Sequence, residues 1–147
     1  MQSNTYLSIE NKIAHNLGVI VLASQEIEST LKFLTSVLGE DENYSVMQRY
    51  NRIKKKPLGE MTTLFASKAE RGGREVKKLL KKYVNIRNEV VHHFVETYSK
   101  ELTSGDKQAI VFDLASRALK LQSIAGQLKV FAAQVADTIL NEDRPAC

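Results

Sequence analysis

The sequence predicts an all-α fold, a helical bundle of three long helices and one broken segment of short helices. Apolar residues recur at alternating steps of three and four over long stretches, as they do on the buried face of an amphipathic helix. No segment alternates apolar and polar residues with the period of two that is typical of a half-buried strand. The chain also has no internal repeat and no linker rich in Pro or Gly. We therefore expect one domain at residues 5–141, followed by a short flexible tail at residues 142–147.

The first helix is predicted from Thr5 to Leu38. It ends at Gly39, because glycine suits the left-handed conformation that follows many helices. Ser24 is the one polar interruption of its apolar face. That face has the spacing of a bundle seam and consists of Ile13, Leu17, Ile20, Ile27, Leu31, Leu34 and Leu38.

Two short helical stretches follow a loop at residues 40–43. The first is predicted over residues 44–53 and ends in a lysine run before Pro57. The second is predicted from Met61 to Lys68 and ends before the pair Gly72-Gly73, since glycine pairs mark turns.

The third long helix is predicted over residues 74–98, and the last one extends from a cap at Ser104-Gly105-Asp106 to about Asn141. Each has apolar residues on one side. They are Val76, Leu79, Leu80, Tyr83, Ile86, Val90 and Phe94 in the third helix, and Ile110, Leu114, Leu121, Ile124, Leu128, Phe131, Val135 and Ile139 in the last.

Length and composition indicate a cytoplasmic protein. A chain of 147 residues can bury a core without disulfides, and the lone Cys147 cannot close an internal bridge. The first residues lack the pattern of a secretory signal, and no apolar run approaches the roughly 20 residues of a membrane span. We expect no membrane partner.

Positive charge is concentrated in the middle of the chain. Residues 49–87 contain 13 Lys or Arg against three acids, which leaves a balance of −6 for the rest of a chain whose net charge is +4. This distribution fits a face that binds a polyanion, and it also fits self-association of complementary surfaces. A solvated, lysine-rich helix surface is the plain alternative.

The segment Arg87-Asn88-Glu89-Val90-Val91-His92 carries the chemistry. Arginine is a permanent cation that grips phosphate, and histidine exchanges a proton near neutral pH, so the pair suits cleavage of a phosphodiester and RNA is the first substrate to consider. On an ideal helix a polar and basic stripe leads to the histidine, and it consists of Arg74, Lys78, Lys81, Asn85, Asn88 and His92. Arg74, Lys78 and Lys81 are the predicted RNA-binding residues.

Arg87 lies outside that stripe, because an ideal helix projects it about 140° away from His92 and onto the apolar side. A guanidinium there needs a partner or a purpose. It is explained either by an ion pair with Glu26 or Glu28, or by a crevice where two chains meet, or by a distortion of the helix near the motif. Its position beside Asn88 and His92 favours a functional reason.

No cofactor or metal is expected. His93 follows His92 directly, whereas metal ligands on one helix are usually three or four residues apart. We assign His93 and Glu28 supporting roles at most.

The string from Ile86 to His92, late in the third long helix of a bundle, resembles the motif of the HEPN superfamily (higher eukaryotes and prokaryotes nucleotide-binding domain). Residues 25–32 are similar to the acidic, Leu-rich first helix of many members. The resemblance implies a HEPN-like bundle and a metal-independent endoribonuclease that works as a homodimer with a composite site. By position, Arg87 would hold the scissile phosphate, His92 would act on the 2′-hydroxyl or the leaving oxygen, and Asn88 would orient either group.

The family also suggests regulation and alternatives. The resemblance is to toxins of toxin–antitoxin and phage-defence systems, and in HEPN toxins paired with a nucleotidyltransferase antitoxin a tyrosine two residues after the histidine can be modified with AMP. Phe94 stands there, so an antitoxin would have to act in another way. A non-catalytic HEPN-like adaptor is one alternative, with the motif arginine locked in a salt bridge and no open space beside the histidine. A plain helical interaction module, with Arg87 paired to Glu28, is the other.

Overall fold

The computed structural model describes residues 8–38, 43–56, 60 and 73–142, except for the side chains of residues 73–76. This part of the chain is mostly helical and contains no strand, so the all-α prediction is confirmed. Its elements are α1 (Ile9–Val37), α2 (Val46–Ile53), α4 (Gly73–Arg87), the π-helical turn η1 (Asn88–His92), α5 (Phe94–Thr97), α6 (Ser99–Ser104) and α7 (Lys107–Glu142).

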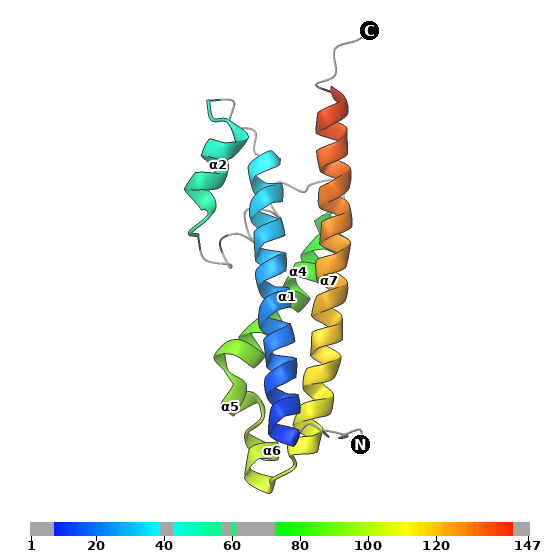
Figure 1. The fold of residues 1–147 in the computed structure, drawn as a ribbon. Helices are drawn as coiled ribbons and strands as arrows, with labels where there is room; N and C mark the ends of the chain where they lie inside the picture. The colour runs from blue at the N-terminus through cyan, green and yellow to red at the C-terminus, as the bar shows by residue number, and fades with distance from the viewer. Residues whose placement is uncertain (1–7, 39–42, 57–59, 61–72, 143–147) are drawn as a thin grey trace, which may run out of the picture.

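The helices α1 and α7 lie side by side and run in the same direction (Figure 1). Contacts near their first turns fix this register, since Lys107 Nζ lies 2.9 Å from Glu10 Oε1 and Asn16 Nδ2 donates to the Val111 carbonyl at 3.4 Å. In the sequence, α1 is connected to α7 through α4, η1, α5 and α6, and these elements lead back to the end of the molecule where α7 begins. A crossover of this length lets two helices pack in parallel.

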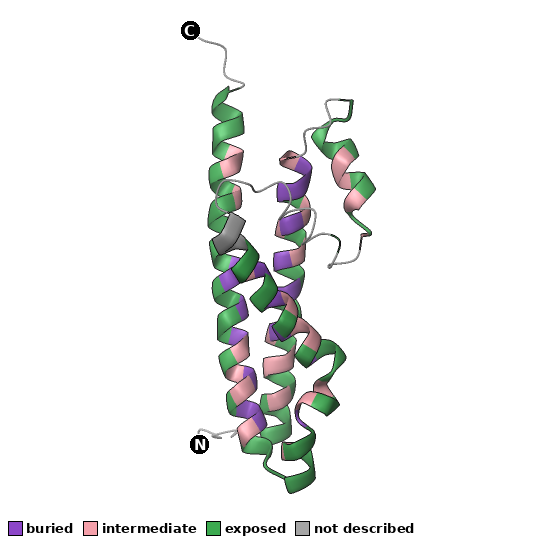
Figure 2. Cartoon of the chain, turned by 180° about the vertical axis from the view of Figure 1, so that it is seen from behind, coloured by how far each residue is buried: buried purple, intermediate pink, exposed green. Residues whose placement is uncertain are grey.

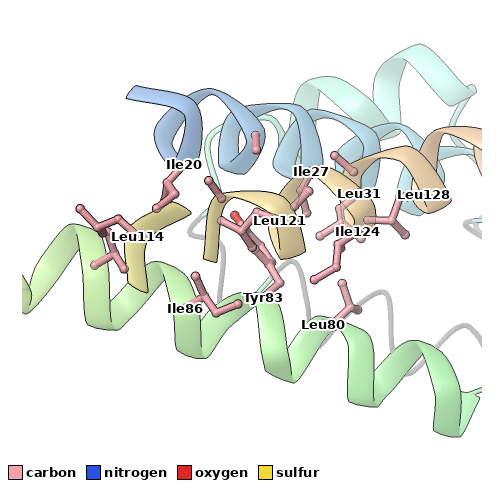
Figure 3. Packing of buried hydrophobic residues seen from close by; sticks show 14 of the residues in the cluster. Ile20, Ile27, Leu31, Leu80, Tyr83, Ile86, Leu114, Leu121, Ile124 and Leu128 are labelled. Atoms are coloured by element: carbon pink, nitrogen blue, oxygen red, sulfur yellow. The ribbon is translucent and has the colours of Figure 1, made fainter. Parts of the chain in front are cut away.

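The core lies where α4 crosses the α1 and α7 pair (Figure 2). Figure 3 shows the packing, with α4 facing both long helices. The predicted seams are confirmed at their centres, where the following side chains are fully or almost fully buried: Ile20, Ile27, Leu31, Leu34, Leu80, Tyr83, Ile86, Ile110, Leu114, Leu121, Ile124 and Leu128.

Ser24 interrupts the apolar face of α1 for a structural reason. The Tyr83 side chain has no exposed surface, and its hydroxyl donates to the Ser24 carbonyl at 3.2 Å. A small residue at position 24 leaves room for the phenol to reach the backbone, and the bond satisfies a buried hydroxyl.

Polar residues cap the helices as their sequence suggests. Ser8 accepts from the Asn11 N–H at the start of α1, and Ser45 with Gln48 forms a capping box at the start of α2. Before α7, Gly105 adopts φ 76° and the Asp106 carboxylate accepts from the Ala109 N–H at 3.1 Å. Positive φ favours glycine, which explains why the turn contains one.

Several predicted boundaries are wrong. The helix expected over residues 74–98 is interrupted after Arg87 by the π-turn, and α6 occupies residues 99–104, for which the sequence predicts no helix. The predicted seam also extends too far along α7, because Phe131 and Ile139 are exposed. The C-terminal part of α7 extends past the end of α1 (Figure 1), so fewer described neighbours cover it. The stretch from Met61 to Lys68 and residues 143–147 lie outside the described residues.

None of the helices in the described ranges is both long enough and apolar enough to cross a membrane.

Candidate active site

A π-helical turn occupies the centre of the motif. The His93 N–H donates to the Asn88 carbonyl at 3.0 Å, across five residues, whereas an α-helix would direct it to the Glu89 carbonyl. The longer step leaves less rotation per residue, so side chains five apart come to lie on nearly the same side. The third explanation offered for Arg87, a helix distorted near the motif, is therefore the one that the structure contains.

This turn brings Arg87 and His92 into contact. Arg87 NH1 lies 3.0 Å from His92 Nε2, although an ideal helix would separate the two side chains by about 140°. A guanidinium has only donors, so Nε2 must accept and carries no proton. In this contact the imidazole is neutral and holds its proton on Nδ1. Arg87 is half-buried and His92 is exposed, which leaves the ring accessible to a ligand.

Asn88 and His93 frame the turn. The Asn88 carbonyl accepts the bond that closes it, and the Asn88 side chain is half-buried with no hydrogen bond to any described residue. His93 supplies the closing N–H, and its side chain is exposed. Both residues thus have a defined backbone task in the motif, while their proposed chemical roles stay predictions.

The ion pair considered for Arg87 is not formed. Glu28 pairs instead with Lys32 at 3.7 Å, and Glu26 pairs with Lys129 of α7 at 3.1 Å. Each acid of α1 meets a lysine that lies nearer than the guanidinium. Glu28 and Arg87 both act on Tyr83 but in opposite directions, since the carboxylate raises the pKa of Tyr83 and the guanidinium lowers it.

The basic stripe is only partly as predicted. Lys78 and Lys81 are exposed on α4, whereas the Arg74 side chain lies outside the described residues. The stripe continues through the exposed Asn85 to Asn88, but the π-turn then carries His92 towards Arg87. The prediction assumed one unbroken α-helix over residues 74–98, and the structure departs from it after Arg87.

A set of polar residues that sequence reasoning missed supports the turn from α7. Arg117 NH1 contacts the Glu89 carboxylate, and Arg117 Nε donates to Asp113 Oδ2 at 2.8 Å. The Tyr98 hydroxyl donates to the same Asp113 oxygen at 2.6 Å. The one available signal was the spacing of Asp113 and Arg117, four residues apart on a helix.

Burial and hydrogen bonds shift the ionisation of this set. Burial, together with the bond to Asp113, raises the pKa of Tyr98. Burial lowers the pKa of Arg117, but its hydrogen bonds to Glu89 and Asp113 outweigh that effect, so the net pKa is raised. Tyr98 therefore stays neutral and Arg117 stays charged at any physiological pH.

A surface hollow of about 400 Å³ lies elsewhere, between α1 and α7. Its lining consists of Leu22, Gln25, Glu26, Ser29, Thr30 and Lys129. No motif residue lines this hollow. Among the residues of the described ranges, no three His, Cys, Asp or Glu are grouped as metal ligands.

Comparisons with known proteins give no further guide: no protein-family model matches the chain, and neither does a curated protein or a solved structure.

Proposed function

We propose that this chain is a metal-independent endoribonuclease of the HEPN type, acting as a homodimer and serving as the toxin of a toxin–antitoxin or phage-defence system. The single observation that carries the proposal is the 3.0 Å contact between Arg87 NH1 and His92 Nε2 beside an exposed imidazole. A cation with no carboxylate partner among the described residues, next to a neutral histidine, suits phosphodiester cleavage through the 2′-hydroxyl.

The reaction follows from the atoms in contact. An incoming phosphate is a stronger acceptor for a guanidinium than an imidazole is, so Arg87 turns to the phosphate oxygens and releases the Nε2 lone pair. His92 then takes the proton of the ribose 2′-hydroxyl, and the 2′-oxygen attacks phosphorus while the bond to the 5′-oxygen breaks. The products are a 2′,3′-cyclic phosphate and a 5′-hydroxyl.

The remaining groups complete the proposal. Asn88, whose amide has no partner among the described residues, orients the phosphate or the imidazole. Lys78 and Lys81, exposed on α4, hold the RNA backbone on its way to the site. His92 of a second copy, in its protonated form, supplies the proton that the leaving 5′-oxygen needs.

Two features favour an enzyme over the adaptor and the plain interaction module. The adaptor requires a motif arginine held in a salt bridge, and the interaction module requires the pair with Glu28. Within the described residues, Arg87 is bonded to His92, while Glu28 is bonded to Lys32. His92 is exposed rather than enclosed.

The test is cleavage of a labelled RNA by purified protein in EDTA. We expect cleavage with cyclic phosphate ends, and no cleavage of the same sequence with 2′-O-methyl riboses. Arg87→Ala should lower the rate about 10²-fold to 10³-fold, and His92→Ala should lower it about 10²-fold to 10⁴-fold. Lys129→Ala, a change on α7 at a lysine that pairs with Glu26 and not with a motif residue, is the matched control. Uncut RNA with the wild type, or equal cleavage by His92→Ala, would reject the proposal.

A further inference from the structure

An isolated π-turn is less stable than the same residues wound as α-helix, unless other contacts hold it. Its hydrogen bonds span five residues, and such turns occur mainly as single turns, often at functional sites. In η1 the change of partner takes the His93 N–H away from the Glu89 carbonyl. That carbonyl instead accepts the Thr97 hydroxyl at 2.8 Å. The backbone bond lost inside the motif is thus replaced by a side chain from the next turn.

A second device holds the same residue from outside the helix. The Glu89 carboxylate is bound by Arg117, which reaches over from α7, 28 residues farther along the chain. Glu89 lies between Arg87 and His92 in the sequence, so the direction of its side chain depends on how the π-turn is wound. A contact that fixes Glu89 on α7 therefore fixes the directions in which the two motif side chains leave the backbone.

Arg117 is itself held in place. Its Nε donates to Asp113 at 2.8 Å, and Asp113 accepts from the Tyr98 hydroxyl at 2.6 Å. The Arg117 side chain is only 19% exposed, and Tyr98 is 3% exposed. The chain of contacts from Tyr98 to Asp113 to Arg117 to Glu89 therefore begins in the core and ends in the motif. Arg117 contacts the carboxylates of both Glu89 and Asp113, and these two charged hydrogen bonds restrict the movement of its side chain.

We infer that Arg117 is a positioning residue, which, through Glu89, holds the π-turn that keeps Arg87 against His92. Without this link, the turn is free to wind as α-helix, in which the two side chains diverge by about 140°. The inference rests on the proposed function only where it predicts an effect of Arg117 on RNA cleavage. The geometry of the motif is a property of the folded chain and can be measured without RNA.

The direct measurement is the tautomer of His92, read from the nitrogen and proton correlations of ¹⁵N-labelled protein at pH 8. In the wild type, Arg87 donates to Nε2, so we expect the proton on Nδ1. In Arg117→Met the contact is lost, and we expect the proton to shift towards Nε2. Lys129→Met removes another pair between α7 and a neighbouring element, with Glu26, and should leave the His92 signals unchanged.

Two changes at Glu89 keep the test independent of folding, since this residue is exposed. Glu89→Met should reproduce the tautomer change of Arg117→Met, and the double variant should be no worse than either single one. Glu89→Gln, which still offers Arg117 an oxygen, should restore most of the Nδ1 form.

In the cleavage assay, Arg117→Met and Glu89→Met should each lower kcat about 10²-fold, with little change in KM, because they misplace reacting groups without removing them. A wild-type His92 tautomer that persists in both variants would overturn the inference, whatever their activity. If the tautomer shifts as expected but the wild type leaves RNA intact, the positioning role stands and the proposed nuclease falls.

Discussion

Arg87 is a guanidinium whose hydrogen-bond partner is an imidazole rather than a carboxylate. Most half-buried arginines are neutralised by an acid, because an unpaired charge is costly to desolvate. Here the nearby acids of α1 are engaged by lysines, Glu28 by Lys32 and Glu26 by Lys129. Among the described residues, no carboxylate neutralises Arg87, and a neutral neighbour such as the His92 ring can be displaced by a ligand at little electrostatic cost.

Tyr83 is the buried group that links α4 to α1, and its ionisation makes the stability of the fold depend on pH. Burial raises the pKa of Tyr83 to about 12 from its ordinary 10, even though Arg87 opposes the shift. The folded protein therefore binds this proton more tightly than the unfolded chain. The stabilisation is complete below pH 10 and is lost as the pH rises towards 12.

We expect Tyr83→Phe to cost about 1 kcal/mol at pH 7, where only the hydrogen bond to the Ser24 carbonyl is lost. Between pH 10 and 12 the free energy of unfolding of the wild type should fall by roughly 2 to 3 kcal/mol more than that of the variant. Urea unfolding followed by circular dichroism at several pH values measures both. Parallel curves for the two proteins above pH 10 would contradict the assignment to Tyr83.

At the scale of elements, the long helices were predictable and the π-turn was not. The seams of α1 and α7 persist over many turns, so their apolar spacing determines which face is buried. One extra residue in a turn hardly disturbs such a pattern, because Val90 remains buried and Phe94 half-buried with the turn in place. The turn depends on the contact between Glu89 and Arg117, which are 28 residues apart. The periodicity of a local segment cannot indicate a contact between residues so far apart in the sequence.

The same reasoning separates what the sequence could indicate about the candidate site from what it could not. Arg87, Asn88 and His92 were selected from their chemistry, which needs no geometry. Their mutual arrangement required the fold, and the unbroken helix assumed for it gave the wrong angle between Arg87 and His92. The division into α5 and α6 was also missed, since these helices are too short for a periodic signal.

The exposed face of α4 provides a prediction at this scale. If Lys81 contacts a phosphate in the proposed RNA complex, Lys81→Ala should weaken binding similarly for all RNA sequences and reduce the slope of log K against log salt by about 1. Fluorescence anisotropy at several salt concentrations measures the slope.

Lys120→Ala is the matched control, because Lys120 is an exposed lysine on α7 and the net charge changes equally. Equal slopes for the two variants would mean that the effect of Lys81 is one of overall charge, and that α4 does not form the RNA path.

At the scale of the whole molecule, α4 covers one side of the α1 and α7 pair, and the chain from η1 onward runs along the edge of that layer (Figure 2). Two apolar residues beside His92 stay uncovered, Val91 at 42% and Val95 at 65% exposure. Exposed valines are ordinary singly, but a pair that flanks a candidate site is a natural place for a second copy. The proposed homodimer would cover them and bring its own His92 to the site.

Val95→Glu tests this assembly, because a carboxylate buried at a two-fold interface would meet its own symmetry mate and oppose association. We expect sedimentation to show a dimer for the wild type and a monomer with unchanged helix content for the variant, with cleavage lost at protein concentrations where the wild type is active. Val130→Glu is the control, since Val130 lies on α7 with a similar exposure of 60% and outside the motif. It should remain dimeric and active. A Val95→Glu protein that sediments and cleaves like the wild type would show that this face does not join the copies.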